Sequence, residues 1–276
     1  MQIAKQAFGG GLLFVAAVMI WIQSASSHAL ERDSGLLLLA LPVLLFIPGI
    51  LKWKGGKVAP HANSLPFSGL LLLFAGLLLQ ITALAALGWA YCAATWLKAN
   101  TWTTPGKLEL LAVLSLGFPW IEQDLSYLAW VFRWSGAYTT DLFASWVGLD
   151  VVRHGVLLRV EGLPVEIAPA CAGMQSLQVL LFSSGIVCLC GPKAQGLSFW
   201  RAQGLMFLAA IFSHHLRIWL LTLSGLWFGK VTASGTLHDV VGFFSLSFAV
   251  LLWILWQNKS RAPLDQTSRI QGGKTA

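Results

Sequence analysis

The amino-acid sequence predicts an all-α polytopic membrane protein with about eight transmembrane helices, a small extracytoplasmic β-hairpin and an amphipathic helix. Composition is the first reason: of 276 residues, 57% are hydrophobic and only 11% are Asp, Glu, Lys or Arg. Soluble domains carry about 25% charged residues, so only lipid can solvate this much apolar surface. The composition excludes a soluble enzyme, a disordered chain and a secreted disulfide scaffold. The second reason is that uncharged stretches recur between short basic loops.

The expected spans begin with residues 8–22, which we interpret as a retained helix rather than a cleaved signal peptide. The next apolar stretch, 37–51, follows too closely for a secreted domain to start between them. Residues 65–97 carry no charge and exceed the roughly 20 residues that one helix needs. They predict two short spans with a tight turn near Ala83–Leu87. Four further spans complete the set: 108–120, 175–189, 199–223 and 240–256.

The segment between the fifth and sixth spans is too polar to cross lipid. Within residues 121–150, acidic and basic residues alternate with Leu, Trp, Val and Phe. This pattern predicts an amphipathic helix that lies at the membrane interface. In residues 151–167, the turn signal Glu161-Gly162 separates two runs rich in β-branched residues, which predicts a small β-hairpin.

Lysine and arginine indicate the orientation, because they accumulate in cytoplasmic loops. Eight spans with both termini inside place every basic loop in the cytoplasm: 52–57, 98–107, 193–201 and the tail. The segments left outside are 28–33, 121–170 and 225–237. We expect residues 1–256 to form one integral membrane domain and residues 257–276 to form its basic cytoplasmic tail. The net charge of +7 belongs to these loops, and no nucleic-acid partner is expected because no basic run is interleaved with aromatic residues.

Three polar side chains, Cys171, Arg217 and His238, are expected at the outer ends of their spans. Cys171 precedes the sixth span, Arg217 lies near the outer end of the seventh, and His238 precedes the eighth. Taken alone, each has an ordinary explanation: a packing cysteine, an arginine that snorkels to the headgroups, and an interfacial histidine. An arginine inside a span is costly, however, and usually functional. Convergence on one level of the membrane favours a shared site.

Together these side chains have the chemistry for acyl transfer by a thiol. The helix expected to begin near Pro169 favours the thiolate of Cys171 at its positive end, and the small neighbouring residues leave room for a peptide backbone. A guanidinium can stabilise an oxyanion, and a histidine can move a proton near neutral pH. The remaining cysteines lie within spans and are interpreted as packing residues: Cys92, Cys188 and Cys190. No metal or other cofactor is expected.

Two histidines precede Arg217 on the same expected helix. His214 is three residues away and shares its face, whereas His215 points away. We expect His214 to position Arg217 or a substrate carbonyl rather than to exchange protons. Each of these histidines taken alone is also compatible with a packing role.

The segment Ala-Cys-Ala-Gly-Met-Gln-Ser-Leu, residues 170–177, resembles the A-C-S-G-[LM]-[RQ]-S-L signature of exosortases and archaeosortases. Arg217-Ile218 is similar to the arginine motif of that family, and Leu237-His238-Asp239 to its L-H-[DE] motif. The resemblance covers about residues 65–256, and eight spans also match the family.

The resemblance assigns catalytic roles to the cysteine, the arginine and the histidine of these motifs. Three residues that follow the cysteine are candidate substrate-binding or supporting residues: Gly173, Gln175 and Ser176. The sequence departs from the family pattern at two places. Ala172 replaces a frequent serine, and His214 stands where the family often has asparagine, which leaves the subfamily and the substrate motif open.

By this resemblance the chain is a cysteine transpeptidase or protease of the bacterial inner membrane, with its active site facing the periplasm and a thioester intermediate. Its implied partners are membrane lipid and exported proteins with a PEP-CTERM-like C-terminal signal, made of a short motif, a transmembrane helix and a basic tail. Such enzymes often accompany exopolysaccharide production. An alternative is a transporter or polysaccharide-assembly component in which Arg217 and His238 line a substrate path, although the sequence lacks the internal repeat and paired broken helices of many transporters.

Overall fold

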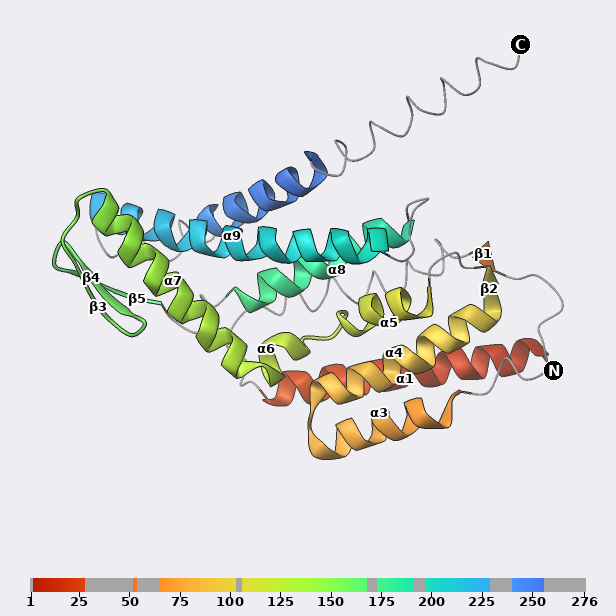
Figure 1. The fold of residues 1–276 in the computed structure, drawn as a ribbon. Helices are drawn as coiled ribbons and strands as arrows, with labels where there is room; N and C mark the ends of the chain where they lie inside the picture. The colour runs from red at the N-terminus through yellow and green to blue at the C-terminus, as the bar shows by residue number, and fades with distance from the viewer. Residues whose placement is uncertain are drawn as a thin grey trace, which may run out of the picture. The chain divides into compact units, whose positions relative to one another are not determined.

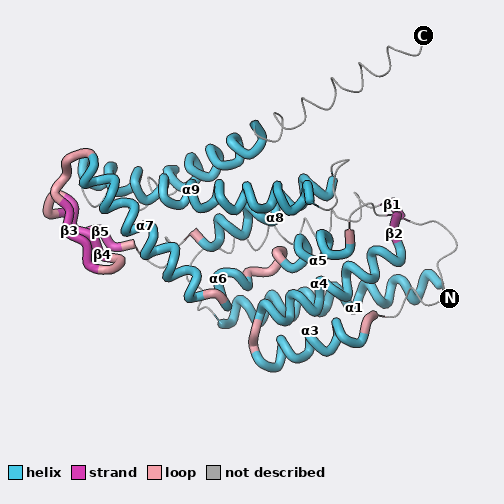
Figure 2. Tube along the Cα trace, viewed as in Figure 1, coloured by secondary structure: helices cyan, strands magenta, loops and turns pink. Residues whose placement is uncertain are grey.

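The computed structural model describes residues 2–27, 52–53, 65–102, 106–167, 173–190, 197–228 and 240–255. Helices dominate this part of the chain and two small antiparallel sheets accompany them (Figures 1 and 2), which agrees with the expected all-α membrane class. The expected span at 37–51 lies outside the described residues, as do Cys171 and His238.

The chain divides into two compact units, and each is considered by itself: Met1–Ser126 with Leu181–Gln203, and Tyr127–Leu180 with Gly204–Ala276. The labelled helices are α1 Gln2–Ser27, α3 Phe67–Leu79, α4 Thr82–Asn100, α5 Lys107–Ser115, α6 Trp120–Asp124, α7 Ser126–Trp146, α8 Met174–Cys190 and α9 Leu197–Phe228. A further helix spans Val240–Leu255. The strands are β1 Lys52–Trp53, β2 Thr101–Trp102, β3 Val151–His154, β4 Leu157–Val160 and β5 Leu163–Glu166.

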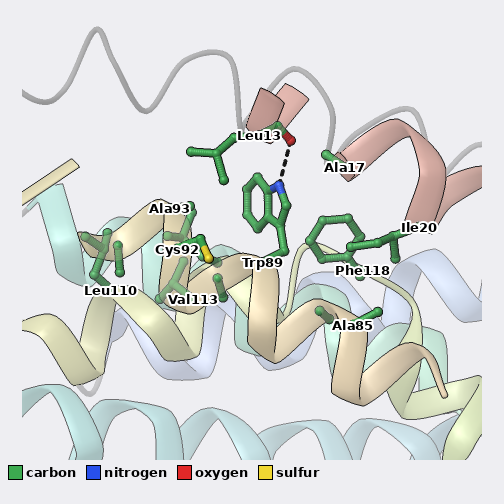
Figure 3. Packing of buried hydrophobic residues seen from close by; sticks show 14 of the residues in the cluster. Leu13, Ala17, Ile20, Ala85, Trp89, Cys92, Ala93, Leu110, Val113 and Phe118 are labelled. Atoms are coloured by element: carbon green, nitrogen blue, oxygen red, sulfur yellow. Dashed lines mark hydrogen bonds between the residues drawn. The ribbon is translucent and has the colours of Figure 1, made fainter. Parts of the chain in front are cut away.

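The first unit is organised around α4, which packs against α1, α3, α5 and α6. Its buried face is rich in alanine, so neighbouring helices approach closely. Trp89 lies in the middle of this core: its indole N–H donates to the carbonyl oxygen of Leu13 at 2.7 Å (Figure 3). Its ring meets Phe118 edge-on, with centroids 5.1 Å apart. Because a buried indole N–H needs an acceptor, this hydrogen bond fastens α4 to α1.

The uncharged stretch 65–97 forms two helices, as expected, but the predicted position of the turn at 83–87 is wrong. The chain reverses at Gln80, which adopts the left-handed conformation with φ 57°. The backbone N–H of Ile81 then donates to the carbonyl oxygen of Gly76 at 3.0 Å, which closes the end of α3.

A remote helix explains why α4 begins so early. The backbone N–H of Ala83 donates to the carboxylate of Asp124 on α6, and the hydroxyl of Thr82 donates to the side-chain oxygen of Gln123 at 2.8 Å. A carboxylate at this place satisfies a free N–H group of the first turn and complements the helix dipole. The start of α4 therefore depends on α6, some 40 residues further along the chain.

The number of spans stays a prediction. In the part of the chain that the structure describes, one helix, Ser198–Phe228, is long and apolar enough to cross a membrane. Four shorter apolar helices accompany it: Gly9–Ser24, Phe67–Leu79, Met174–Leu189 and Val240–Leu255. The run 108–120 is not one continuous helix, because α5 ends at Ser115 and α6 starts at Trp120. The nine residues of α5 extend about 13 Å, roughly half of a hydrocarbon core.

Strands β1 and β2 form a short antiparallel pair, with Lys52 opposite Trp102 and Trp53 opposite Thr101. They belong to two loops, 52–57 and 98–107, which the charge pattern assigns to the same side of the membrane. The pairing places residues 52–53 beside residues 101–102, which directly follow α4, and this is consistent with that assignment.

The proposed topology predicts that residues 57 and 161 lie on opposite sides of the membrane. We expect a membrane-impermeant maleimide to label a cysteine at Glu161 in intact cells, and to label one at Lys57 only after lysis, because the basic loop stays inside. Both cysteines are introduced into a Cys171→Ala chain, because Cys171 is itself expected at the outer face, and that chain without an added cysteine is the control; Cys92 is fully buried. Labelling of both positions in intact cells would refute the eight-span topology.

In the second unit, residues 151–167 form a three-stranded antiparallel sheet of order β3-β4-β5 rather than the expected two-stranded hairpin. The expected turn at Glu161-Gly162 is confirmed, and both of its residues have positive φ. A second tight turn was missed at Gly155-Val156. Gly155 has φ +66° and stands at the first central position of this two-residue loop, where type II′ hairpins require glycine.

The sheet packs on α7, the helix that the amphipathic pattern of 121–150 predicted. Buried Ala137 and Ala144 of α7 form one apolar cluster with Leu158 and Val160 of β4. At the edge, Arg153 pairs with Asp141 at 3.1 Å, and its guanidinium lies 5.5–5.8 Å from two stacked α7 rings, those of Trp134 and Tyr138. These contacts fix the segment that leads toward Cys171.

Candidate functional site

The predicted site residues that the structure describes all belong to the second unit. Arg217 and His214 lie on α9, whereas Gly173 immediately precedes α8 and its neighbours Gln175 and Ser176 lie in the first turn of that helix. Gln175 and Ser176 are partly exposed at this helix start. Because Cys171 and His238 lie outside the described residues, the candidate site is described from their nearest described neighbours in the sequence.

Gly173 forms the N-terminal boundary of α8. Its carbonyl oxygen accepts the first helical hydrogen bond, from the N–H of Leu177 at 2.9 Å. Its φ of +74° lies in the left-handed region that side chains disfavour. A Cβ placed on Gly173 would stand 2.7 Å from Nδ1 of His214. Glycine is thus required twice here, for the backbone conformation and for the close approach of the helix start to the imidazole ring.

His214 is 6% exposed and lies between Gly173 and α7. Its Nε2 atom is 3.2 Å from the carbonyl oxygen of Phe132. A carbonyl oxygen can only accept, so Nε2 donates and, in a neutral ring, Nδ1 is left as the acceptor. Gly136 permits this contact, because a Cβ there would stand 3.4 Å from Nε2 and 2.4 Å from Cδ1 of Ile218. The acceptor nitrogen therefore faces the start of α8.

His215 has a different environment, as helical spacing predicted. It is also buried, but its Nδ1 atom bonds the carbonyl oxygen of Ile211, one turn earlier on its own helix, at 2.7 Å. Its ring meets that of His214 edge-on, with centroids 5.3 Å apart. His215 is satisfied within α9 and supports the neighbouring ring by packing.

The Arg217 guanidinium lies against the first turn of the helix Val240–Leu255. A Cβ placed on Gly242 would stand 3.0 Å from Cζ, 3.1 Å from Nη2 and 3.2 Å from Nε of Arg217. The flat face of the guanidinium thus covers the backbone at Gly242, where a larger residue would displace it. His238 precedes this helix by two residues.

Gly173 of the cysteine motif and Gly242, three residues beyond the histidine motif, both lie against one stretch of α9. Gly173, from the cysteine motif, touches His214; Gly242, four residues after His238, touches Arg217; and the two α9 residues are one helical turn apart. These contacts are compatible with a thiol before α8, a guanidinium within α9 and an imidazole before the helix Val240–Leu255, the groups that thiol-dependent acyl transfer requires.

One residue of this region was missed in the sequence. The Nε–H group of Arg133 on α7 donates to the carbonyl oxygen of Ile167 at 2.6 Å. Sequence reasoning assigned Arg133 only to the polar face of an interfacial helix. A side chain that bonds a backbone carbonyl 34 positions away leaves no local periodicity, so no spacing pattern was available to find it.

The other described cysteines fit the packing interpretation. Cys92 is fully buried in α4, and a Cβ on Gly69 would stand 2.6 Å from its sulfur. Cys188 is partly buried against the same apolar core of the first unit.

Comparison with known proteins gives one match. The sequence model of a family described as transmembrane exosortases matches residues 3–256, nearly the whole chain. No curated protein and no solved structure matches. The matched range contains all three motifs and extends over the N-terminal helices as well.

Proposed function

Because the chain belongs to the transmembrane exosortase family, we propose that it is a membrane-embedded cysteine transpeptidase or protease that cleaves the C-terminal sorting signal of exported proteins. Membership supports a membrane transpeptidase role in general, and the family acts on exported proteins bearing C-terminal sorting signals. The proposal adds the nucleophile, the intermediate and the side of the membrane: Cys171, a thioester and the periplasmic face of the inner membrane.

In the proposed reaction, the thiolate of Cys171 attacks the scissile carbonyl carbon and forms a tetrahedral oxyanion. Arg217 stabilises that oxyanion, or the thiolate before attack, through its charged N–H donors. Collapse breaks the C–N bond, leaves the acyl group as a thioester on Cys171, and releases an amine that takes its proton from His238. Water or an acceptor amine then attacks the thioester and regenerates the thiol.

The observation that supports this mechanism best is the pair of contacts that His214 and Arg217 of α9 make with Gly173 and Gly242. Gly173 stands two residues after the proposed nucleophile and contacts His214, while Arg217 covers Gly242, four residues after the proposed proton donor in the sequence. The chemistry needs three groups from distant parts of the chain in one place, and the contacts of Gly173 and Gly242 with α9 support that arrangement. A substrate helix in the same bilayer would present its motif at this level, which raises the local concentration of the cleavage site.

Co-expression with a tailed reporter tests the function. The reporter is an exported protein with a C-terminal motif, a transmembrane helix and a basic tail, chosen from the same genome by that pattern. We expect a shortened reporter only when the chain is present, with the new C-terminus located by mass spectrometry. A reporter without the short motif is the control. An unchanged reporter across such candidates would contradict peptide cleavage and favour a transport path instead.

Replacement of Arg217 by lysine is expected to lower processing by about 10²-fold, the typical cost of losing one oxyanion donor. Lysine keeps the charge, but its ammonium cannot reproduce the planar fork that lies against Gly242. The measurement is the initial rate of reporter cleavage at equal membrane abundance. Arg201→Lys is the matched control, since Arg201 is an exposed arginine on the same helix. A wild-type cleavage rate for Arg217→Lys would contradict the proposal that Arg217 stabilises the oxyanion.

Replacement of Gly173 by alanine is expected to reduce processing as well. The left-handed conformation costs a residue with a side chain about 1–2 kcal/mol, and the new methyl group would stand 2.7 Å from Nδ1 of His214. The start of α8 must shift, and the nearby nucleophile with it. Gly204→Ala is the control, because a Cβ there meets no atom within 4 Å. Equal cleavage rates for the two variants would contradict a tight helix start at Gly173.

A further inference from the structure

Two residues on different helices hold the ends of the segment that carries Cys171. Ile167 is the last described residue before this segment and Gly173 is the first one after it. Arg133 of α7 bonds the carbonyl oxygen of Ile167, and His214 of α9 lies against Gly173. All four residues belong to the second unit.

The first contact fixes the exit from the sheet. Ile167 is 3% exposed, and its N–H donates to the carbonyl oxygen of Val156 at 3.3 Å. Its own carbonyl oxygen accepts from Arg133 at 2.6 Å. Hydrogen bonds from a charged donor are about twice as strong as neutral ones. Both polar backbone groups of this residue are therefore satisfied, one by the sheet and one by α7.

The second contact fixes the start of α8. His214 is itself locked, because its Nε2–H group donates to Phe132 of α7 while Nδ1 faces Gly173. Gly136 allows α7 to approach closely enough for this bond. The ring cannot turn without losing its acceptor, so it forms a fixed surface for the helix start. Phe132 and Arg133 are consecutive residues of α7, so one turn of this helix supports both contacts.

We propose that Arg133 and His214 are positioning residues that fix both ends of the segment 168–172 and thereby set the place of the Cys171 thiol. The proposal rests on the proposed function in taking Cys171 as the nucleophile. A nucleophile displaced by about 1 Å can lose 10²-fold in rate, so a shift of Ile167 or Gly173 is expected to lower the rate of attack by Cys171. Neither residue acts on the substrate; each acts through the backbone beside the cysteine.

The test compares conservative and non-conservative variants of the full-length protein in membranes. Arg133→Met removes the donor and keeps the length of the side chain, and His214→Leu removes both ring nitrogens. His214→Asn keeps an amide oxygen in the place of Nδ1 beside Gly173. Arg159→Met is the matched control, because Arg159 is an exposed residue of β4. For each variant, reporter cleavage gives kcat and KM, and mass spectrometry gives the rate at which a maleimide alkylates Cys171.

We expect kcat to fall by at least about tenfold in Arg133→Met and His214→Leu with little change in KM, because the nucleophile is displaced while substrate binding persists. The alkylation rate of Cys171 should change in the same two variants, and His214→Asn and Arg159→Met should resemble the wild type. Unchanged kcat and alkylation in both non-conservative variants would overturn the proposal. If Arg133→Met does not accumulate, Arg133→Lys decides instead: wild-type kcat there, where a single ammonium replaces the planar fork, overturns the role of Arg133.

The alkylation readout separates this inference from the proposed function. Thiol reactivity needs no substrate, so it reports the position of Cys171 whatever the protein cleaves. If the reporter were processed without Cys171, the function would fall while an altered alkylation rate would still support the two positioning residues. If cleavage of the reporter required Cys171, but the Arg133 and His214 variants had the alkylation rate and kcat of the wild type, only the positioning proposal would be contradicted.

Discussion

Replacement of Cys171 by alanine is expected to abolish processing of a tailed reporter. Without the sulfur no thioester forms, and the guanidinium and the imidazole have no nucleophile to assist. Cys171→Ser should also lose activity, because a hydroxyl ionises far less readily than a thiol in the same place. The measurement is the amount of mature reporter at equal abundance of the variant in the membrane, followed over a time long enough to detect a rate about 10³-fold below that of the wild type. Loss of a catalytic nucleophile can cost about 10⁶-fold, so no mature reporter is expected.

The remaining cysteines provide the controls for this experiment. Cys188→Ala removes a partly buried thiol that packs against the core of the first unit, and it should leave the reporter rate near that of the wild type. Transport through a polar path would survive Cys171→Ala, whereas thiol catalysis would not. Full processing by Cys171→Ala would therefore contradict the whole mechanism, including the roles of Arg217 and His238.

Local patterns predicted those parts of the fold that local interactions determine. The amphipathic pattern of residues 121–150 yields α7, and the Glu161-Gly162 signal yields a type I′ turn between β4 and β5. The turn between α3 and α4 was misplaced because α4 starts where Asp124 and Gln123 cap it. A cap from a remote helix leaves no mark in the sequence beside it.

The third strand of the sheet was missed for a different reason. In this turn Gly155 is the only turn-forming residue, and it is followed by Val156. A β-branched residue next to a single glycine is typical of a strand that continues rather than of a turn. The residues of β3 and β4 then look like one long run. Register shows the actual arrangement: His154 pairs with Leu157 across the two-residue loop, and Val151 pairs with Val160.

In the candidate site, too, the sequence predicted features that depend on local spacing and missed contacts between residues far apart in the chain. Helical spacing correctly separated His214, which faces Gly173 and α7, from His215, which bonds its own helix. The glycines at positions 136 and 242 gave no signal on their own, because their importance lies in what approaches them: Ile218 and the Arg217 guanidinium. The hydrogen bond from Arg133 to Ile167 likewise joins a helix, α7, to the extended chain after β5, and no sequence motif connects the two.

Replacement of His238 by asparagine is expected to lower processing by about 10²–10⁴-fold, the usual contribution of general acid–base catalysis. Asparagine keeps hydrogen-bonding groups of similar size but cannot transfer a proton to the leaving amine. The same replacement at His214 should preserve much of the rate. There the amide oxygen can take the place of Nδ1 beside Gly173.

The comparison is made on cleavage rates of the two asparagine variants, with His154→Asn as the matched control because His154 is an exposed histidine of β3. A pH series sharpens the result: if His238 moves the proton, its variant should lose the pH dependence of kcat that the wild type and His214→Asn share. The burial of His214 between two helices argues for a fixed ring rather than one that exchanges protons with a substrate. Should His214→Asn prove inactive while His238→Asn cleaves normally, the proton donor would be His214, and its Nδ1 atom, already directed at the start of α8, would be the atom that carries the proton.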